Sequence, residues 1–572
     1  MKSVSGLSPW KVEKIAVVGA GVVGVPMAAL LAQARIRIGV DRPASVVLIQ
    51  RNSATSGWKV AAVNSGRSPL GGVEPGLERI IARSVDAGLL RASHDYASLR
   101  EADAIVICAQ TDKAGMSPDY GPLFEAVGAI AQALKERRRR RTPLIIFEST
   151  LAPSSMATLV WERFRRLGLR EGRDIRLAHS PNRVMPGRLV ERIVSSDKLV
   201  GGLSEDTPGL VQCLYGKIVK KGRLHLVNCL TAEIVKTLEN AYRDVRIAFS
   251  VEIARYCDTR DIDFYRVRDQ VNRRLAWDDS ASGDPQAVPS AGILVPTIGV
   301  GGHCLPKDGI LLLWRKLQAG GDTRDSLILA ARSINDGSPL KAARALRKLA
   351  GRLERKRVTL LGVAYRANSA DARNSPSRAH GRILAEQGSR LRLHDPYLRP
   401  NDPNLVRSGL AASFTGDLAD ALSDAEFLVF CTGHQYYQDN MGSIVISAPG
   451  LKAVYDGCNL SKRSAFTGCE VNYGGVGKGT RPPSPELLDF VHRCFLAVEI
   501  GFANELKADI DFLNERYVRR DFDHVDFREV QRLAGTCVTG CRIADPSPAA
   551  AVPAHARFLP RLVRRANRQG RP

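Results

Sequence analysis

The chain has 572 residues, of which 44% are hydrophobic and 25% are charged. This composition is typical of a soluble globular protein, and the length is too great for one hydrophobic core. There is no run of eighteen apolar residues and no apolar N-terminal leader with a cleavage site. We therefore expect a cytoplasmic protein of several domains without a membrane segment.

The formal net charge of +24 raises the question of a nucleic-acid partner. Part of it is concentrated at residues 137–141 and part in the tail after Asp545, which has six arginines and no acid. Neither cluster is interleaved with aromatic residues, so we expect no nucleic-acid partner. The eleven cysteines are scattered, which fits reduced thiols, and the lone C-x3-C at 537–541 has no second ligand pair, so we expect no metal.

Residues 14–18 predict a buried strand, and a G-x-G-x-x-G motif at 19–24 follows it before an alanine- and leucine-rich helical stretch to about residue 34. In this context Gly19 makes a tight turn, Gly21 lets the backbone approach a pyrophosphate, and Gly24 packs helix against strand. The helix N-terminus then offers free N–H groups to phosphate. The motif predicts a dinucleotide site, and the alternative is an α/β turn that binds no phosphate.

The next predicted strand, residues 45–50, should end in an acid that holds the ribose hydroxyls of NAD. It ends instead in Gln50, Arg51 and Asn52. Gln50 or Asn52 can bond those hydroxyls, whereas Arg51 leaves room for a 2′-phosphate, so NAD is preferred and NADP stays open. Strands at 104–108 and 143–147 extend a parallel sheet, and Thr150 lies at the edge where such sheets bind ligands.

One long helix is predicted over about 231–260, with Lys236 and Asn240 four residues apart and thus on one face. They either point into one cleft or form an exposed polar pair. After a polar, flexible stretch at 278–286, three glycines, Cys304, Pro306, Lys307 and Asp308 fall within residues 299–308. A thiol in such a polar, glycine-rich loop is typical of a reactive cysteine, and the alternative is an inert one.

A second α/β unit begins at 357–362. It continues through 371–376 into a helix, a strand that ends at 394–396, and another strand at 427–431. A helical stretch is predicted from about 485 to 517, followed by a Pro/Ala/Arg-rich tail that we expect to be disordered.

In this order the motifs resemble those of the nucleotide-sugar 6-dehydrogenases, the family of UDP-glucose, GDP-mannose and UDP-N-acetylhexosamine dehydrogenases. The resemblance covers about residues 12–465. It rests on the glycine fingerprint, N-S-G-R-S-P at 64–69 with E-P-G-L at 74–77, E-S-T at 148–150, the Lys236/Asn240 helix, G-G-H-C-L-P-K-D at 301–308 and D-A-R-N-S-P at 371–376.

The resemblance implies an α/β fold with two Rossmann-like doubly wound domains, joined by a central helical domain with a long helix. We expect an NAD-binding domain at 12–215, the helical domain with the cysteine loop at 216–340 and a UDP-sugar-binding domain at 345–465. A helical extension would follow at 466–545, either packed on the core or enlarging a subunit interface, and then a disordered basic tail at 546–572.

The implied activity is an NAD-dependent four-electron oxidation of a sugar C6 alcohol to a carboxylate. Cys304 would add to the intermediate aldehyde to give a thiohemiacetal and then a thioester. Lys236 and Asn240 would donate to the oxyanions, while Asp308 and Thr150 would orient water or the lysine. The expected cofactor-binding residues are Gly19, Gly21, Val22, Val23, Gly24, Gln50, Asn52, Thr111 and Thr150.

One departure from the family concerns hydrolysis of the thioester. A glutamate usually follows the Ser-Pro pair that matches residues 180–181, but this chain has Asn182, which cannot accept a proton. Either Glu148 or Asp308 replaces it as base, or hydrolysis is slow, or the chain is a catalytically silent binding protein.

His303 before the cysteine resembles the N-acetylhexosamine branch of the family, so we expect UDP-N-acetylglucosamine or UDP-N-acetylmannosamine as substrate, with UDP-glucose as the alternative. The family also suggests a homodimer or larger homo-oligomer and a role in polysaccharide biosynthesis. The substrate-binding residues implied by the resemblance are Asn182, Arg183, Lys236, Asn240, Arg243, Gly301, His303, Tyr365, Arg366 and Arg373.

Overall fold

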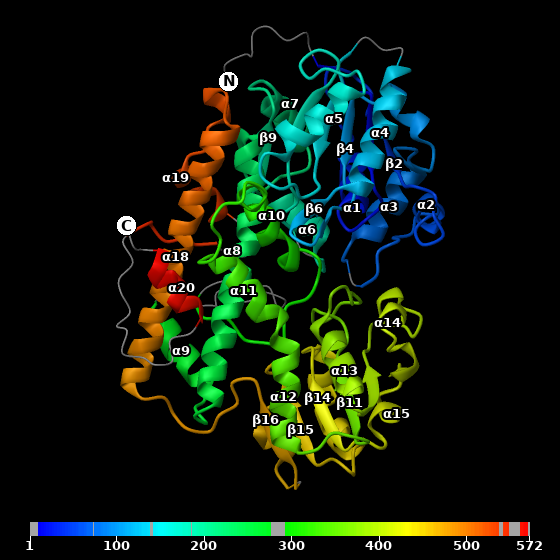
Figure 1. The fold of residues 1–572 in the computed structure, drawn as a ribbon. Helices are drawn as coiled ribbons and strands as arrows, with labels where there is room; N and C mark the ends of the chain where they lie inside the picture. The colour runs from blue at the N-terminus through cyan, green and yellow to red at the C-terminus, as the bar shows by residue number, and fades with distance from the viewer. Residues whose placement is uncertain are drawn as a thin grey trace. The chain divides into compact units, whose positions relative to one another are not determined.

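The fold is taken from a computed structural model that describes residues 10–72, 74–137, 141–184, 186–275, 292–468, 470–536, 541–547 and 561–569. They form two compact units (Figure 1). The first falls within 1–239, 310–321 and 509–538, and the second within 240–309, 322–508 and 539–572. Cys537 of the C-x3-C pair and the polar stretch at 278–286 lie outside the described residues.

The first unit is built on an eight-stranded sheet in the order β10-β9-β8-β7-β4-β1-β2-β3, parallel except between β8 and β9. Its strands are β1 (Lys14–Val18), β2 (Ser45–Ile49), β3 (Leu90–Ser93), β4 (Ala104–Ile107), β7 (Leu144–Phe147), β8 (Arg176–His179), β9 (Lys198–Gly202) and β10 (Leu224–Asn228). Its helices include α1 (Gly24–Gln33), α2 (Trp58–Asn64), α3 (Leu77–Asp86), α4 (Gly121–Lys135), α5 (Trp161–Arg166), α6 (Leu189–Ser195) and α7 (Thr207–Tyr215). A hairpin, β5 (Asp112–Ala114) and β6 (Ser117–Asp119), follows β4.

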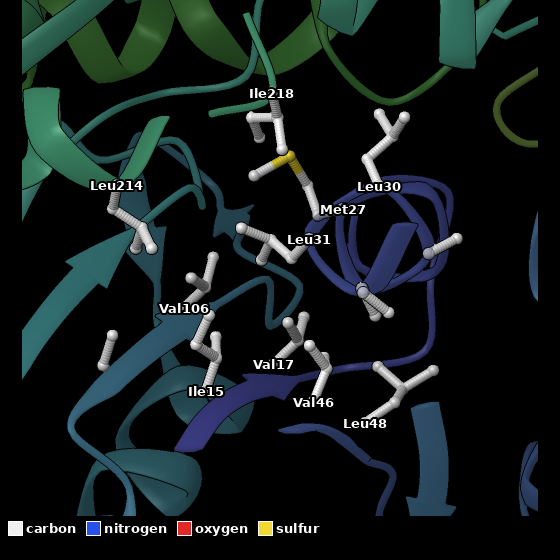
Figure 2. Packing of buried hydrophobic residues seen from close by; sticks show 14 of the residues in the cluster. Ile15, Val17, Met27, Leu30, Leu31, Val46, Leu48, Val106, Leu214 and Ile218 are labelled. Carbon is white, nitrogen blue, oxygen red and sulfur yellow. The ribbon is translucent and has the colours of Figure 1, made fainter. Parts of the chain in front are cut away.

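The central strands of this sheet are buried on both faces, which is why they read as continuous apolar runs in the sequence. Figure 2 shows one face, where Met27 and Leu31 of α1 pack with Val17 of β1 and Val106 of β4. Isoleucines and a phenylalanine of β4 and β7 fill the other face. The sheet and α1 therefore form a rigid base for the loops that follow β1, β4 and β7.

The second unit contains a six-stranded parallel sheet in the order β13-β12-β11-β14-β15-β16. Its strands are β11 (Arg357–Leu361), β12 (Arg390–His394), β13 (Phe414–Thr415), β14 (Phe427–Phe430), β15 (Ala453–Asp456) and β16 (Asn472–Gly475). The helices that follow its strands are α13 (Pro376–Glu386), α14 (Pro403–Arg407), α15 (Leu418–Leu422), α16 (Gln435–Asp439) and α17 (Met441–Ile446). The two sheets confirm the predicted pair of Rossmann-like domains.

The predicted central helices are α8 (Cys229–Asp258), α9 (Phe264–Arg274), α10 (Leu305–Gln318), α11 (Leu327–Asp336) and α12 (Ser338–Ala350). At 1.5 Å per residue, α8 is about 45 Å long. The boundary between the two units falls inside α8 and α10. Lys236 accordingly belongs to the first unit and Asn240 to the second.

The extension packs on its own chain. In the second unit α18 (Pro485–Tyr517) lies antiparallel to α8, because three ring pairs run in opposite order: Phe490 with Tyr256, Phe495 with Phe249, and Phe502 with Tyr242. Their centroids are 6.1, 5.6 and 5.3 Å apart. In the first unit α19 (Phe527–Ala534) follows a turn whose carbonyls at Phe522 and His524 accept from the Asn228 amide.

The expectation of a disordered tail is wrong for residues 561–569, which form helix α20 (Arg561–Gln569). Its apolar residues Leu562, Val563 and Ala566 share one face and are buried. Gly501 of α18 allows close approach, since a Cβ there would lie 2.8 Å from the Ala566 Cβ. The arginine-rich composition concealed this apolar face.

Candidate active site

The glycine fingerprint has the shape that a pyrophosphate site needs. Gly19 has φ +108°, and a Cβ on it would lie 2.8 Å from the Cys108 carbonyl oxygen. A Cβ on Gly24, the first residue of α1, would lie 1.8 Å from the Gly19 carbonyl oxygen. At Gly21 a Cβ would meet nothing within 4 Å. Close packing therefore requires glycine at Gly19 and Gly24, while Gly21 borders open space beside the N-terminus of α1, where a dinucleotide phosphate fits.

The end of β2 is tied to this loop by the side chain of Gln50. Its Oε1 accepts from the Ala20 N–H at 2.8 Å, and its Nε2 donates to Ser56 Oγ at 2.9 Å. Lys59 Nζ also donates to the Ala20 carbonyl, at 3.0 Å. Gln50 therefore holds the glycine loop, which leaves exposed Asn52 as the freer partner for ribose hydroxyls. Lys59 was not foreseen, since a lone surface lysine carries no sequence signal.

The loops after β4 and β7 meet at the same edge of the sheet. Thr111 Oγ1 donates to the carbonyl of Thr150 at 2.8 Å, so two predicted cofactor residues are joined. Farther along, Glu233 of α8 accepts from the backbone N–H groups of Ser154 and Met156, each at 2.7 Å. Burial raises the pKa of Glu233 to about 8, partly offset by these two bonds and by Arg315. Glu233 thus anchors the loop after Thr150 to the helix turn that carries buried Lys236.

Arg183 and Glu148 are already engaged inside the first unit. Arg183 forms an ion pair with Glu239 at 2.5 Å and donates to the Leu533 carbonyl of the extension at 3.1 Å. Buried Glu148 accepts from Lys198 Nζ at 2.8 Å and from the Tyr215 hydroxyl at 2.6 Å. Both side chains are therefore engaged by protein groups in this structure, and the roles of Arg183 toward the substrate and of Glu148 as an alternative base stay predictions.

Asn182 also forms hydrogen bonds with neighbouring backbone groups. Its Oδ1 accepts from the Val184 N–H at 2.7 Å, which closes a turn of the kind that Asn side chains favour. Its own N–H donates to the Glu148 carbonyl at 3.2 Å. The residue at the family's glutamate position therefore shapes the loop.

In the second unit Cys304 immediately precedes α10 and is exposed, as is Cys213 among the described cysteines. Its carbonyl accepts from the N–H groups of Lys307 and Asp308 at 3.0 and 2.8 Å, so the helix begins at the cysteine. The first turn of a helix has free N–H groups and a positive dipole end, which favour an anion. Cys304 is therefore accessible and lies at the N-terminal end of a helix.

Asp308 is fully buried behind the cysteine turn. Its Oδ2 accepts from Asn240 Nδ2 at 2.6 Å, and its Oδ1 pairs with Lys307 Nζ at 2.9 Å. The structure thus joins Asn240 of α8 to the helix that starts at Cys304. Asn240, Cys304 and Asp308, three of the predicted catalytic residues, belong to this one arrangement.

The segment after β11 supports the glycine loop before Cys304. Gly302 N–H donates to the Arg373 carbonyl at 2.9 Å, and a Cβ on Gly302 would lie 2.8 Å from the Tyr365 ring. Burial raises the pKa of Tyr365 to about 12, helped by Asp371 and Cys304. The Arg373 guanidinium forms a bidentate pair with Asp371, which raises its pKa, and Cys304 adds to that effect. Tyr365 and Arg373 thus lie beside the glycine that comes two residues before the cysteine.

Three further predicted substrate residues lie in the same unit. His303 precedes Cys304, Arg366 follows Tyr365 and Arg243 is on α8 one turn after Asn240; each is half-buried. Gly301 packs against Tyr365 as Gly302 does, since its Cβ would lie 2.6 Å from the Tyr365 Cβ. Close contact with this ring explains why the loop has two adjacent glycines.

The sequence did not identify the pair Asp395 and His434, which holds this segment from behind. Asp395 Oδ2 accepts from the N–H groups of Val363 and Ala364, each at 2.8 Å, and lies 3.1 Å from His434 Nε2. His434 Nδ1 accepts from the Asn368 N–H at 2.9 Å. An acid directly after a predicted strand, as Asp395 follows β12, is the available sequence signal.

The described residues were searched for metal sites and for membrane-spanning helices. They contain no group of three or more His, Cys, Asp and Glu side chains arranged to hold a metal ion. None of their helices is both long enough and apolar enough to cross a membrane.

Comparison with known proteins places these features in one family. Models of the UDP-glucose/GDP-mannose dehydrogenase family match in three parts: the NAD binding domain at residues 13–219, the central domain at 230–337 and the UDP binding domain at 359–463. The UDP-N-acetyl-D-mannosamine dehydrogenase of Pyrococcus horikoshii is 30% identical over 82% of this chain and 99% of its own. The NDP-N-acetyl-D-galactosaminuronic acid dehydrogenase of Ralstonia nicotianae is also 30% identical, over 76% and 96%.

Solved structures agree. The NDP-N-acetyl-D-galactosaminuronic acid dehydrogenase of Methanosarcina mazei superimposes with a TM-score of 0.66 and 31% identity, covering 82% of this chain and 96% of that one. The UDP-D-ManNAc dehydrogenase of Pyrococcus horikoshii superimposes with a TM-score of 0.67 and 31% identity, covering 82% and 99%.

Proposed function

Because the chain belongs to the UDP-glucose/GDP-mannose dehydrogenase family, and is thus an NAD-dependent nucleotide-sugar dehydrogenase, we propose that its substrate is a UDP-N-acetylhexosamine. UDP-N-acetylmannosamine is the first candidate and UDP-N-acetylglucosamine the second. The sugar is supported by the names of the relatives and by His303 before the cysteine. The mechanism is supported chiefly by exposed Cys304 at the start of α10, with the buried Asn240–Asp308 bond behind it.

In the proposed reaction Cys304 performs the covalent chemistry. NAD, held at the glycine fingerprint, supplies the hydride acceptor for both oxidations. After the C6 alcohol has become an aldehyde, the Cys304 thiolate adds to it and forms a thiohemiacetal, which then loses a hydride to become a thioester. Water releases the carboxylate and regenerates the thiol. Lys236 and Asn240 donate to the oxyanions, and one donor in a dry site is worth about 3 kcal/mol.

Asp308 is the better candidate for the residue that assists thioester hydrolysis. Asn182 cannot accept a proton, and both oxygens of Glu148 and of Asp308 are engaged by protein groups, so the choice between the two carboxylates rests on position in the chain. Asp308 is in the turn that begins at Cys304. Glu148→Gln and Asp308→Asn test this choice, since only the Asp308 variant should accumulate covalent enzyme; accumulation in the Glu148 variant alone would reverse it.

A homodimer and a role in polysaccharide biosynthesis remain parts of the proposal, supported by the family resemblance. The face of α8 that carries Tyr242, Phe249 and Tyr256 is covered by α18, so a second subunit would bind another face. Light scattering after size-exclusion chromatography measures the oligomeric state.

The main experiment counts NADH by absorbance with UDP-N-acetylmannosamine, UDP-N-acetylglucosamine, UDP-glucose and GDP-mannose. The wild type should form two NADH for each N-acetylated sugar consumed, whereas Cys304→Ser should form at most one. Cys213→Ser is the matched control, because Cys213 is also exposed. Two NADH per sugar in Cys304→Ser would refute the covalent mechanism, and turnover of UDP-glucose alone would refute the proposed sugar.

A further inference from the structure

The second unit contains a cavity of about 580 Å³ that the proposed reaction does not use. It is lined by the C-terminal part of α8, by α12, by Thr297 and Ile298, by Arg463 and by the segment that starts at the end of β16. None of the predicted catalytic, cofactor or substrate residues lines it. Its volume is that of a typical small-molecule site.

Cationic side chains dominate the wall of this cavity. Six line it, against the two carboxylates Asp258 and Asp261; they are Arg255, Lys341, Arg344, Lys348, Arg463 and Lys478. Burial raises the pKa of Asp258 to about 7, and its Oδ1 accepts from the Gly477 N–H at 2.9 Å, so its charge is only partly developed near neutral pH. A concave site with one sign of charge concentrates counter-ions of the other sign.

Several of these cations form no ion pair within 4 Å with a described residue, although Glu252 interacts with Arg255 and Lys341 at longer range, as Asp258 does with Arg255 and Lys348. Lys341, Arg344 and Lys348 are three and seven residues apart on α12, hence on one face, and no described residue forms a hydrogen bond or an ion pair with their side chains. Arg255 Nη2 donates to Ser338 Oγ at 2.8 Å, while its Nη1 is buried and has no hydrogen-bond partner among the described residues. A buried guanidinium N–H without a partner is costly, and an anion in the cavity would satisfy it.

The rest of the wall suits the organic part of a phosphorylated molecule. Tyr455 and Tyr473 line the cavity with Ile298, Leu349 and Val251, which supply apolar area beside the cations. Small-molecule sites commonly combine such a wall with a few fixed polar groups. The combination favours a phosphate-bearing metabolite over a simple ion.

We propose that this cavity is a second ligand site, which binds a phosphorylated small molecule of about nucleotide size through Arg255, Lys341, Arg344 and Lys348. The site adjoins the start of the catalytic loop. Thr297 Oγ1 donates to the Gly299 carbonyl at 2.7 Å, and the same loop reaches Cys304 five residues later.

The test measures binding and not turnover, so it is independent of the proposed reaction. Isothermal titration of the full chain with inorganic pyrophosphate should detect binding, and Lys341→Ala/Lys348→Ala should weaken it by about tenfold or more. Arg347→Ala is the matched control, because Arg347 is an exposed cation of α12 that does not line the cavity. Thermal unfolding of each variant checks that it is folded.

Binding that is absent in the wild type, or equal in the wild type and the double variant, would overturn the proposal. The second arm repeats the pyrophosphate titration in the presence of saturating UDP-N-acetylmannosamine. Retained binding supports a separate site. Binding abolished by the sugar nucleotide, together with weaker sugar-nucleotide binding in the double variant, would show that the cavity holds the nucleotide end of the substrate and would overturn the separate site.

Discussion

Replacing Asp308 with asparagine should cost stability and activity for different reasons, which can be separated. Asp308 is fully buried and pairs with buried Lys307 at 2.9 Å. Asp308→Asn leaves the Lys307 ammonium buried without its counter-ion, and breaking such a pair costs about 3–5 kcal/mol. In a cooperative unit of about 150–250 residues this lowers the thermal midpoint by about 6–20 °C.

A second substitution removes the unpaired charge. Lys307→Met in the Asp308→Asn background leaves no buried ion, so we expect the double variant to regain about half or more of the lost midpoint. The midpoint is followed by circular dichroism. It is compared between variants and not converted to one free energy, because a chain of several domains does not unfold in two states.

Activity should not follow stability in this series. The Asn240 amide loses its charged acceptor at 2.6 Å in both variants, so NADH formation should stay low in the double variant at a temperature where it is folded. A double variant that regains both midpoint and rate would show that Asp308 serves folding alone. A single variant with an unchanged midpoint would refute the argument from the buried pair.

Three further predictions concern the supports of the site. Phe495→Ala removes a buried ring from the α8–α18 contact and should cost about 3–5 kcal/mol, whereas Leu496→Ala, 41% exposed on the same helix, should lower the thermal midpoint little. The pKa of Glu233 is raised to about 8 in the folded chain, whereas an unfolded glutamate loses its proton near pH 4.3. Between about pH 4 and 8 the folded chain therefore binds more protons, and the stability of the wild type falls as pH rises. The thermal midpoint of Glu233→Gln minus that of the wild type should therefore increase from about pH 5 to pH 9. A difference that does not change with pH would contradict the raised pKa of Glu233. Leu562→Ala should destabilise α20 by about 2 kcal/mol or more, seen as faster amide exchange there, while Arg564→Ala, an exposed neighbour, should not.

The sequence predicted those features that local patterns determine. The apolar run of β1 and the long helices α8 and α18 were located closely, because each is defined by its own periodicity. The loop at Cys304 was identified because its glycines, proline and polar residues are adjacent in the chain. The structure explains why residues 301 and 302 are glycines: a Cβ on either would clash with the Tyr365 side chain.

Partners that are distant in the sequence could not be predicted. Arg183 was assigned to the substrate, yet its guanidinium contacts Leu533, 350 residues away. Glu148 was a candidate base, yet Lys198 and Tyr215 occupy it across neighbouring strands and helices. Composition predicted disorder for 561–569, although its three buried apolar residues share one face of a helix that packs against α11 and lies close to Gly501 of α18.

The extension supports residues that the family models cover, although those matches end at residue 463. In the second unit α18 buries three aromatic residues of α8, and the Tyr242 hydroxyl donates to Glu499 at 2.5 Å. Each aromatic pair adds about 0.5–1.5 kcal/mol to the burial of its rings. Ending the chain near 465 would therefore expose the aromatic face of the helix that carries Asn240 and leave Arg183 without its Leu533 acceptor. It follows that the fold around Asn240 includes the extension, and we expect a fragment limited to the three family domains to aggregate through that face.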